Sequence, residues 1–180
     1  MAKTCSDSAI RIQPYQLEDA PALMEVFHRA VHAIDGSLYS AAEREAWAPT
    51  PPDGIWWRER LRTMEPEVAW SGAQIAGFAS LLVTVAGASG QLVRQGHIDC
   101  LYTRPDFQRQ GVAAALYSRC TERAIERACT VLTVDASRAA QPFFHARGFR
   151  VVNHNRIALR GQRLANCTMS RAVPTEVVSR

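Results

Sequence analysis

The sequence predicts a single α/β domain built around one mixed sheet. Its 180 residues are enough for one substantial core, and 47% hydrophobic with 21% charged residues is an ordinary globular composition. Apolar segments with strand character alternate with segments of helical periodicity, and no repeat, low-complexity run or linker interrupts them. In the clearest unit, His97 to Ala128, a strand, a glycine-containing loop and a helix follow one another directly. We expect one domain over residues 1–180, with loose termini at 1–8 and 172–180.

The N-terminal third predicts a short strand and three helices. Residues 10–13 alternate between apolar and polar, which indicates the strand. Asp19 can cap the first helix, and Asp35-Gly36 ends it. Two further helices are expected over 40–47 and 53–64, separated by prolines. The first helix is predicted to bury Leu23, Phe27, Ala30 and Ile34.

His28 and His32 are four residues apart on the first predicted helix, which is a spacing that metal ligands use. No carboxylate or cysteine constellation joins them in the sequence. The pair is therefore interpreted as ordinary helix histidines, and no metal site is expected.

The other strands are predicted from apolar runs bounded by turn residues. Residues 68–70 and 74–85 indicate an antiparallel hairpin, and Gly87-Ala88-Ser89-Gly90 leads into a strand over 97–103. A helix is expected over 138–147, because Gly148 stands where a helix stops. The remaining predicted strands cover 131–136, 150–159 and 163–169.

The loop after the strand 97–103 and the helix that it opens predict an anion site. The first turn of a helix leaves N–H groups unpaired and carries the positive end of the helix dipole. Gly111 would let the backbone approach a phosphate, and Arg104 and Arg109 could add charge-assisted contacts. The loop lacks the spacing and lysine of a nucleoside-triphosphate loop, and it is not G-x-G-x-x-G. The helix itself has an apolar stripe of Ala113, Leu116, Tyr117, Cys120 and Ala124, and Arg119, Glu122, Arg123 and Glu126 are expected on its solvated face.

Charge and cysteine usage limit the classes of partner and compartment. The net charge is +4, and the basic residues, all arginine except Lys3, are scattered, so nucleic acid is not expected as a partner. The five cysteines show no C-x-x-C spacing, and the first ten residues carry no apolar signal-peptide core, which favours a cytoplasmic protein with reduced thiols. Cys100 is interpreted as a small buried residue rather than a nucleophile. The uncharged run 68–93 contains too many polar and glycine residues for a membrane span.

The motif Q-R-Q-G-V-A at residues 108–113 resembles the Q/R-x-x-G-x-G/A signature of the GNAT superfamily of N-acetyltransferases. The strand before it, I-D-C-L-Y-T-R-P-D-F, is similar to the family's fourth strand, and residues 130–149 look like its fifth strand with the helix ending in F-Y/F-x-x-x-G-F. The run D-A-S-x-x-A-x-P-F-F is similar to a bacterial, small-molecule subgroup. The resemblance implies a single-domain GNAT fold: a mixed, mostly antiparallel sheet of about seven strands flanked by helices, with strands four and five splayed.

The resemblance also implies acetyl-CoA as co-substrate, without a metal, bound between strands four and five. The amides of pantetheine would pair with the backbone near Leu101 and Thr103, and the pyrophosphate would lie on the amides of residues 109–113. The implied cofactor-binding residues are Leu101, Tyr102, Thr103, Gln108, Arg109, Gln110, Gly111, Val112, Ala113, Ser137, Phe143 and Phe144.

Transfer to an alkylamine needs a neutral nitrogen, so a general base is expected. His97 and Asp99 are the candidates, because they are two residues apart on one strand and so face the same way. The alternative is that both are polar residues satisfied by their neighbours. Phe144 stands where many family members carry a tyrosine that protonates the leaving thiolate; Tyr102, Tyr117 or solvent could substitute.

Large aromatic residues are dense between 37 and 64, where the resemblance implies the acceptor pocket. They either fill the core or wall a cleft for an apolar or aromatic amine. The candidate substrate-binding residues are Tyr39, Trp47, Trp57 and Asp135.

The expected function is acetyl-CoA-dependent N-acetylation of a small-molecule amine by direct attack in a ternary complex. The alternatives are a non-catalytic acyl-CoA-binding module and a protein N-terminal or lysine acetyltransferase. An exposed edge formed by the last strands could support a homodimer.

Overall fold

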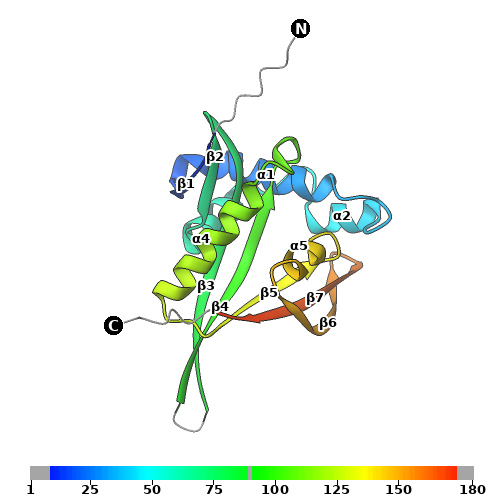
Figure 1. Ribbon diagram of the computed structural model, residues 1–180. Coiled ribbons are helices and arrows are strands. Elements are labelled where there is room, and N and C mark those ends of the chain that lie inside the picture. The colour runs from blue at the N-terminus through cyan, green and yellow to red at the C-terminus, as the bar shows by residue number, and fades with distance from the viewer. Residues whose placement is uncertain (1–8, 89–90, 174–180) are drawn as a thin grey trace.

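The computed structural model describes residues 9–88 and 91–173, which form one seven-stranded sheet with helices on both faces (Figure 1). The strand order is β1-β2-β3-β4-β5-β7-β6, and β4 with β5 is the parallel pair among antiparallel ones. The predicted mixed, mostly antiparallel α/β architecture is confirmed. The strands are β1 (Ile10–Pro14), β2 (Glu67–Ser71), β3 (Gln74–Ala88), β4 (Gln91–Thr103), β5 (Val131–Ser137), β6 (Arg150–Leu159) and β7 (Gln162–Ala172). The helices are α1 (Ala20–His32), α2 (Ala41–Trp47), α3 (Gly54–Met64), α4 (Val112–Glu126) and α5 (Gln141–His145), with 3-10 turns η1 (Leu17–Asp19) and η2 (Pro105–Phe107).

Several element ends differ from the sequence prediction. β4 begins at Gln91 rather than His97, because it pairs with β3 along a long hairpin that projects from the body (Figure 1). Within the predicted connection to β4, Ser89 and Gly90 lie outside the described residues. Helix α5 is shorter than the predicted 138–147, since Ser137 and the residues after it form a turn first.

Of the termini expected to be loose, 1–8 and 172–180, residues 1–8 and 174–180 lie outside the described residues. The prediction of a loose terminus from residue 172 is wrong, because Ala172 pairs with Val131 and Val173 is buried. The Val173 N–H donates to the Thr130 carbonyl at 3.0 Å, which extends the pairing with the β5 side of the sheet.

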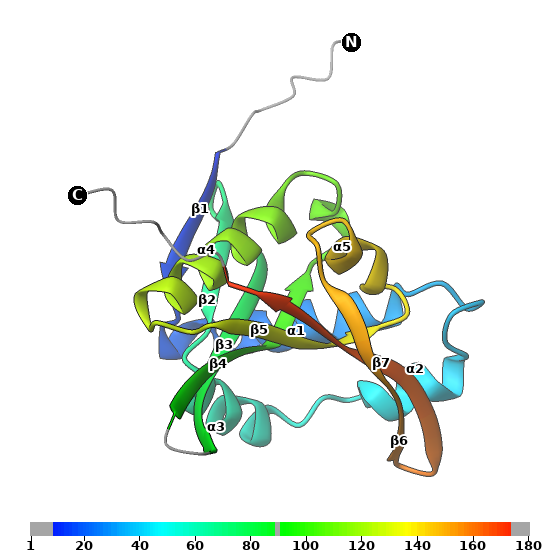
Figure 2. The same ribbon diagram turned by 60° about the horizontal axis from the view of Figure 1, so that its bottom comes forward.

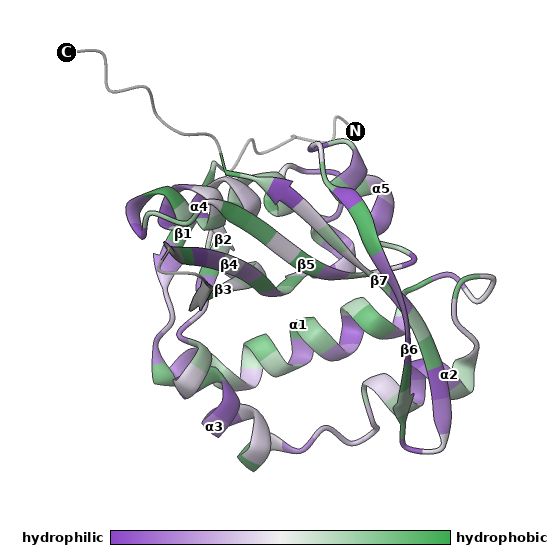
Figure 3. Ribbon diagram, turned by 90° about the horizontal axis from the view of Figure 1, so that it is seen from below, coloured by the Kyte–Doolittle hydropathy of each residue, from purple (hydrophilic) through white to green (hydrophobic). Residues whose placement is uncertain are grey.

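The sheet separates two hydrophobic cores. Helices α4 and α5 cover one face, and α1 and α3 cover the other (Figure 3). The α4 face packs tightly because of Gly77 on β3: a Cβ there would come within 2.5 Å of the Tyr102 carbonyl oxygen and 3.0 Å of Val112 Cγ1. Fully buried members of the α4 core are Leu116, Cys120, Leu132 and Met169, and those of the α1 and α3 core are Leu23, Leu61, Val68 and Phe78.

Two helices use their faces differently from the periodicity prediction. On α1 the buried residues are Ala20, Leu23, Val26, Phe27 and Val31, whereas Ala30 and Ile34 line a cavity beside the helix. On α4, Arg119 and Arg123 are not simply solvated. They lie 3.3 and 3.2 Å from the carboxylate of Glu67, which is buried on β2 and needs their positive charge.

The middle of the sheet has two irregularities: a β-bulge in β4 and the divergence of β4 from β5. Ser80 pairs with Cys100 and Leu81 with Ile98, so Asp99 is a bulged residue of β4. β4 and β5 pair only over Gln95–Ile98 and Val131–Val134, and beyond this point β5 follows β7 away from β4 (Figure 2). The predicted splay of strands four and five is thus confirmed, and it opens the sheet at its centre.

Candidate active site

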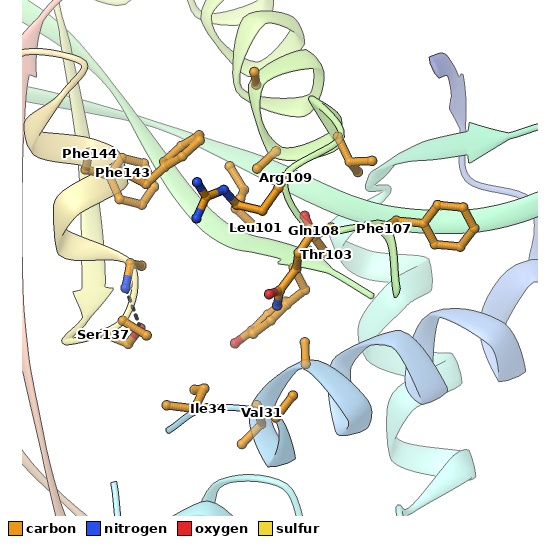
Figure 4. A pocket seen from close by; sticks show the side chains of 18 of the residues that line it. Val31, Ile34, Leu101, Thr103, Phe107, Gln108, Arg109, Ser137, Phe143 and Phe144 are labelled. Carbon is orange, nitrogen blue, oxygen red and sulfur yellow. Dashed lines mark hydrogen bonds between the residues drawn. The ribbon is translucent and has the colours of Figure 1, made fainter. Parts of the chain in front are cut away.

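A cavity of about 600 Å³, here named the β4–β5 cavity, occupies the opening between the two splayed strands (Figure 4). Its walls come from the C-terminal end of α1, the end of β4, the loop before α4 and the segment from β5 to α5. Gln110 is not part of its lining, because its side-chain amide donates to the Asp106 carbonyl at 2.8 Å. The other predicted cofactor-binding residues all line it: Leu101, Tyr102, Thr103, Gln108, Arg109, Gly111, Val112, Ala113, Ser137, Phe143 and Phe144.

The loop before α4 presents backbone N–H groups to this cavity. Arg109 and Gly111 both have left-handed backbone conformations, with φ of 64° and 86°. Ala115 N–H donates to the Gly111 carbonyl at 2.9 Å, so the amides before Ala115 remain available at the helix start. No atom outside its chain neighbours lies within 4 Å of the position that a Gly111 Cβ would take. Turns of this kind at a helix N-terminus form a concave site for a phosphate or diphosphate.

The β4 side of the cavity offers a second set of polar groups. Beyond Ile98, β4 has no partner strand on its β5 side, so backbone groups up to Thr103 face the opening. The Thr103 hydroxyl is buried and has no hydrogen-bond partner among the described residues. A ligand with amide groups fits this edge, since it can add the missing strand.

Opposite this edge, α5 provides an apolar wall. Phe144 is buried, and the ring of Phe143 lies beneath the Arg147 guanidinium, 3.5 Å from the ring centre. Figure 4 shows Arg109 extending into the space between the α4 loop and these rings. The cavity thus offers an anion site, an unpaired strand edge and an apolar wall. These three parts suit the phosphates, the amides and the alkyl segments of a phosphopantetheine chain.

A second cavity of about 520 Å³, here named the tryptophan cavity, lies on the α1 and α3 side. Trp57 stacks against Phe27 with ring centres 4.6 Å apart, and Tyr102 meets Phe27 edge-on at 5.0 Å. Trp47 and Tyr102 line both cavities, so the two spaces meet at these side chains. Its lining residues include Phe27, His28, Trp47, Trp56, Trp57, Arg60, Asp99, Cys100, Tyr102 and Arg160.

Asp99 is the carboxylate at the β4 end of the tryptophan cavity. Its Oδ2 accepts from Arg60 Nη2 at 2.7 Å, and the Arg60 guanidinium lies 5.4 Å from the centre of the Trp56 ring. Burial and the charge of Asp99 raise the pKa of the neighbouring Cys100 thiol to about 12. Cys100 is therefore protonated at neutral pH and is a poor nucleophile. Burial also raises the pKa of Tyr102, which keeps its hydroxyl as a hydrogen-bond donor.

Several predicted residues lie outside both cavities. Tyr39 is buried between Ala165 and Arg138, donating to the carbonyl of the first and accepting from the amide of the second. Asp135 accepts from the Thr168 hydroxyl at 2.6 Å.

His97 and Tyr117 also line neither cavity. His97 shares the α1 and α3 face with Asp99, but its Nδ1 lies 2.9 Å from the Thr133 hydroxyl. The Tyr117 hydroxyl accepts from Arg171 at 2.6 Å.

Four charged or titratable residues of the tryptophan cavity were missed by sequence reasoning, and one of them, Asp53, is the N-cap of α3. His28 follows the buried Phe27 on α1, so helical periodicity placed it at the edge of the buried face. Arg60 is two turns into α3, on the face that carries Trp56 and Trp57. Arg160 lies in the β6–β7 turn and donates to the Ala46 carbonyl at 2.8 Å. No local sequence pattern predicts this contact between distant segments.

Within residues 9–88 and 91–173, no three His, Cys, Asp or Glu side chains gather in a way that could hold a metal ion. In those ranges each helix is too short or too polar to cross a bilayer.

Comparisons with known proteins agree with this geometry. The family model of the acetyltransferase (GNAT) domain matches residues 56–169. The chain is 34% identical over 160 residues to the uncharacterized N-acetyltransferase YafP of Escherichia coli strain K12, covering 89% of this chain and 94% of that protein.

Two solved structures show the same fold. The GCN5-related N-acetyltransferase from Rhodopseudomonas palustris superposes with a TM-score of 0.79 at 32% identity, covering 92% of this chain and 96% of the other. The PaiA N-acetyltransferase from Thermoplasma acidophilum, solved with coenzyme A, gives 0.68 at 15% identity over 91% and 99%. The chain thus belongs to the GNAT superfamily and is an N-acetyltransferase.

Proposed function

We propose that this enzyme acetylates the amine of a small, apolar or aromatic molecule by direct attack in a ternary complex. The observation that carries the proposal is the meeting of the two cavities at Trp47 and Tyr102. A thioester held in the β4–β5 cavity and an amine held in the tryptophan cavity would face each other there. No acyl-enzyme is needed, and the raised pKa of Cys100 argues against one.

Acetyl-CoA would be held mainly by the backbone in this proposal. The amides at the start of α4 would bind its pyrophosphate, with Arg109 adding charge, and the free edge of β4 from Leu101 to Thr103 would pair with pantetheine. The otherwise unpartnered Thr103 hydroxyl gains a hydrogen-bond partner in this arrangement. The acetyl thioester supplies the acyl group, and the protein residues orient it.

Asp99 and His97 remain the proposed catalytic residues on β4. An alkylamine with a pKa near ~10.4 is charged at pH 7, and making it neutral costs roughly 4 to 5 kcal/mol at 1.36 kcal/mol per pKa unit. Asp99 lines the tryptophan cavity and can hold and orient the ammonium before it loses its proton. His97 lines neither cavity and is bonded to Thr133, so in this proposal it would act on the amine only through water.

The leaving thiolate needs a hydrogen bond rather than a strong acid, because an unperturbed thiol has a pKa of about 8.5. Phe144 has no hydroxyl, but Tyr102 stands in the wall that the two cavities share. We propose that the Tyr102 hydroxyl donates to the sulfur and that solvent protonates it.

The small-molecule acceptor is favoured over the alternatives by the size of the tryptophan cavity. About 520 Å³ with aromatic walls accommodates a small ligand rather than an extended peptide segment. A non-catalytic acyl-CoA-binding module would not need a second cavity that meets the first.

Thiol release from acetyl-CoA across a panel of aryl, aralkyl, polyamine and peptide amines tests the proposal. We expect turnover with aralkyl or aryl amines. With the best amine, Asp99→Ala should lower kcat by about 100-fold or more, because the amine loses the carboxylate that orients it for attack. By calorimetry the acetyl-CoA Kd should change less than about 2-fold, because no lost contact belongs to the β4–β5 cavity. Glu126→Ala on the exposed face of α4 is the matched control. Binding of acetyl-CoA without turnover on any amine, or full activity in both Asp99→Ala and His97→Ala, would contradict the proposal.

A cytoplasmic location and a homodimer are further parts of the proposal. The four cysteines among the described residues are all free thiols, which suits a reducing compartment. β6 is an edge strand with Val152 and Ile157 exposed, a surface on which a second copy could pair. Light scattering of the purified protein would test the dimer.

A further inference from the structure

His28 is a titratable group of the tryptophan cavity that has no assigned role. It lies on α1 directly after Phe27, and its half-buried ring lines the cavity together with Trp57, Asp99 and Tyr102. Its Nε2 lies 3.0 Å from the hydroxyl oxygen of Thr50, in the proline-rich segment between α2 and α3.

The partners of Thr50 determine which nitrogen of His28 carries the proton. The Glu45 carboxylate accepts from the Thr50 amide at 2.7 Å and from the Thr50 hydroxyl at 3.1 Å. The amide hydrogen bond is the main cause that lowers the pKa of Glu45, so this carboxylate is charged and only accepts. The Thr50 hydroxyl has thus donated its one proton to Glu45, and its oxygen must accept from His28 Nε2–H. In neutral His28 the lone pair is therefore on Nδ1.

Nδ1 of His28 is available for a ligand. In the part of the chain that the structure describes it has no hydrogen-bond partner, and it is not among the buried, unpartnered side-chain atoms there. The other two candidate bases are occupied: Asp99 is paired with Arg60 at 2.7 Å, and His97 is bonded to Thr133. His28 thus offers a free basic nitrogen that lines the acceptor side.

The surroundings of His28 keep it neutral at pH 7. Burial, and next the stacked His32 ring with its centre 4.3 Å away, lower the pKa of His28 below its ordinary value, whereas Glu45 opposes them. The other charged groups that face the cavity are Asp53 and Arg60 from α3, Asp99 from β4 and Arg160 from the β6–β7 turn. A neutral imidazole can accept a proton without first losing one.

We propose that Nδ1 of His28 accepts the proton that the acceptor nitrogen loses during acetyl transfer, with Glu45 and Thr50 as positioning residues that fix the ring. The inference rests on the proposed function and deepens it. The amine nitrogen forms its bond to the acetyl carbon, the carbon–sulfur bond breaks, and its electron pair leaves with the sulfur. The nitrogen proton passes to Nδ1 and from there to solvent, while the thiolate takes a proton from water. The sum is amine plus acetyl-CoA giving amide plus coenzyme A.

His28→Gln tests this step, because a glutamine amide can still donate to Thr50 but has no basic nitrogen. With the best amine of the panel we expect kcat to fall about 100-fold or more, with the acetyl-CoA Kd changed less than about 2-fold. In the wild type, kcat/KM should rise with pH through the lowered His28 pKa, since only the neutral ring accepts a proton. This acidic limb should be lost in His28→Gln. Added imidazole should restore part of the activity of His28→Ala.

Variants at neighbouring positions separate this role from a structural one. His32→Gln removes the stacked histidine, which does not line the cavity, and should change kcat less than about 3-fold. Thr50→Val removes the positioning hydroxyl and should lower kcat about 10-fold while shifting the acidic limb, and Thr50→Ser should restore both.

Three results would overturn the inference. One is full kcat with an intact acidic limb in His28→Gln, which leaves the proposed function standing if the wild type acetylates amines. The second is a His28→Ala variant that folds, by circular dichroism, but gains nothing from imidazole. The third is a wild type that binds acetyl-CoA without acetylating any amine, in which case the proposed function fails as well. If His28→Gln does not fold, His28→Asn and the imidazole experiment decide.

Discussion

The β4–β5 cavity and the tryptophan cavity meet at Trp47 and Tyr102, but they are built in different ways. The first takes its polar groups from consecutive backbone: the end of β4 and the loop that opens α4. The second takes its polar groups from side chains on α1, α3, β4 and the β6–β7 turn, which are far apart in the sequence.

This difference corresponds to two tasks. The first cavity is suited to a co-substrate that all members of the family share, and the second to an acceptor that differs between members. Backbone amides bind a diphosphate whatever the side chains are, so the first site tolerates substitution except where a Cβ intrudes. Side chains define size, charge and aromatic stacking in the second site, so single substitutions there should change the acceptor without affecting acetyl-CoA. The contrast can be tested by variants that should affect one cavity and spare the other.

The largest separation is expected from Gly111→Val. A β-branched residue is strained at a φ of 86°, and its side chain would enter the open space of the cavity where we propose that the diphosphate binds. We expect the acetyl-CoA Kd to rise by about 30-fold, equivalent to roughly 2 kcal/mol, when measured by calorimetry. Gly72→Val, with a φ of 60° in the β2–β3 turn, has similar strain away from both cavities and should bind normally. Equal Kd values for the two variants would contradict the proposal that the diphosphate binds at the loop before α4.

An intermediate effect on the other cavity is expected from Trp56→Ala. Trp56 is 53% exposed, so its loss should cost little stability, but it removes an aromatic wall and the ring beside Arg60. We expect the KM for an aromatic amine to rise by about 10-fold, the scale of roughly 1.4 kcal/mol of stacking, with the KM for acetyl-CoA unchanged.

Ile55→Ala is the matched control for Trp56→Ala, because Ile55 is the preceding residue, is more exposed and does not line this cavity. A rise in the acetyl-CoA KM of Trp56→Ala would mean that the two cavities are not independent.

The smallest effect is expected from Thr103→Val, which replaces an unpartnered hydroxyl by a methyl group of similar shape. Removing a buried, unsatisfied hydroxyl should stabilise the free enzyme by about 1 kcal/mol, whereas the lost hydrogen bond should raise the acetyl-CoA Kd about 5-fold. Thermal unfolding with and without acetyl-CoA measures both. Thr121→Val on α4, whose hydroxyl is bonded to the Tyr117 carbonyl, should change neither CoA binding nor its effect on unfolding. A less stable free enzyme would show that the hydroxyl is already satisfied.

The same contrast explains which residues could be predicted from the sequence. Gly111 and its neighbours act through local backbone geometry, so a six-residue motif is sufficient to find them. The splay of β4 and β5 was predicted from the resemblance of two strand segments to a known family. The register gives the reason for it: β5 stops pairing with β4 after Val134 but continues to pair with β7. His28 and Arg160 acquire their position only when the segment around Thr50 and the β6–β7 turn fold against α1 and α2. No spacing in the sequence encodes that approach.

Element ends were predicted less well than element types, for related reasons. Ala30 and Ile34 continue the apolar period of α1, but they are covered by a ligand cavity rather than by core. The extension of β4 back to Gln91 depends on pairing with β3, which a single polar strand segment does not reveal. In each case a neighbour in space, not the local pattern, decides the outcome.

The bulge at Asp99 has a consequence for how such a site can change. Ile98 and Leu101 pack on the α4 core, whereas Cys100 and Tyr102 face the opposite core, so the inserted residue reverses the inside-outside phase of β4 midway along its length. Deleting the Asp99 codon would place Cys100 directly after Ile98, opposite Ser80 as it already is, so Tyr102 would keep its face and the site would lose only the carboxylate. A deletion at this position can therefore remove the acidic group without reversing the faces of the residues that follow, because the bulge absorbs the one-residue change in register.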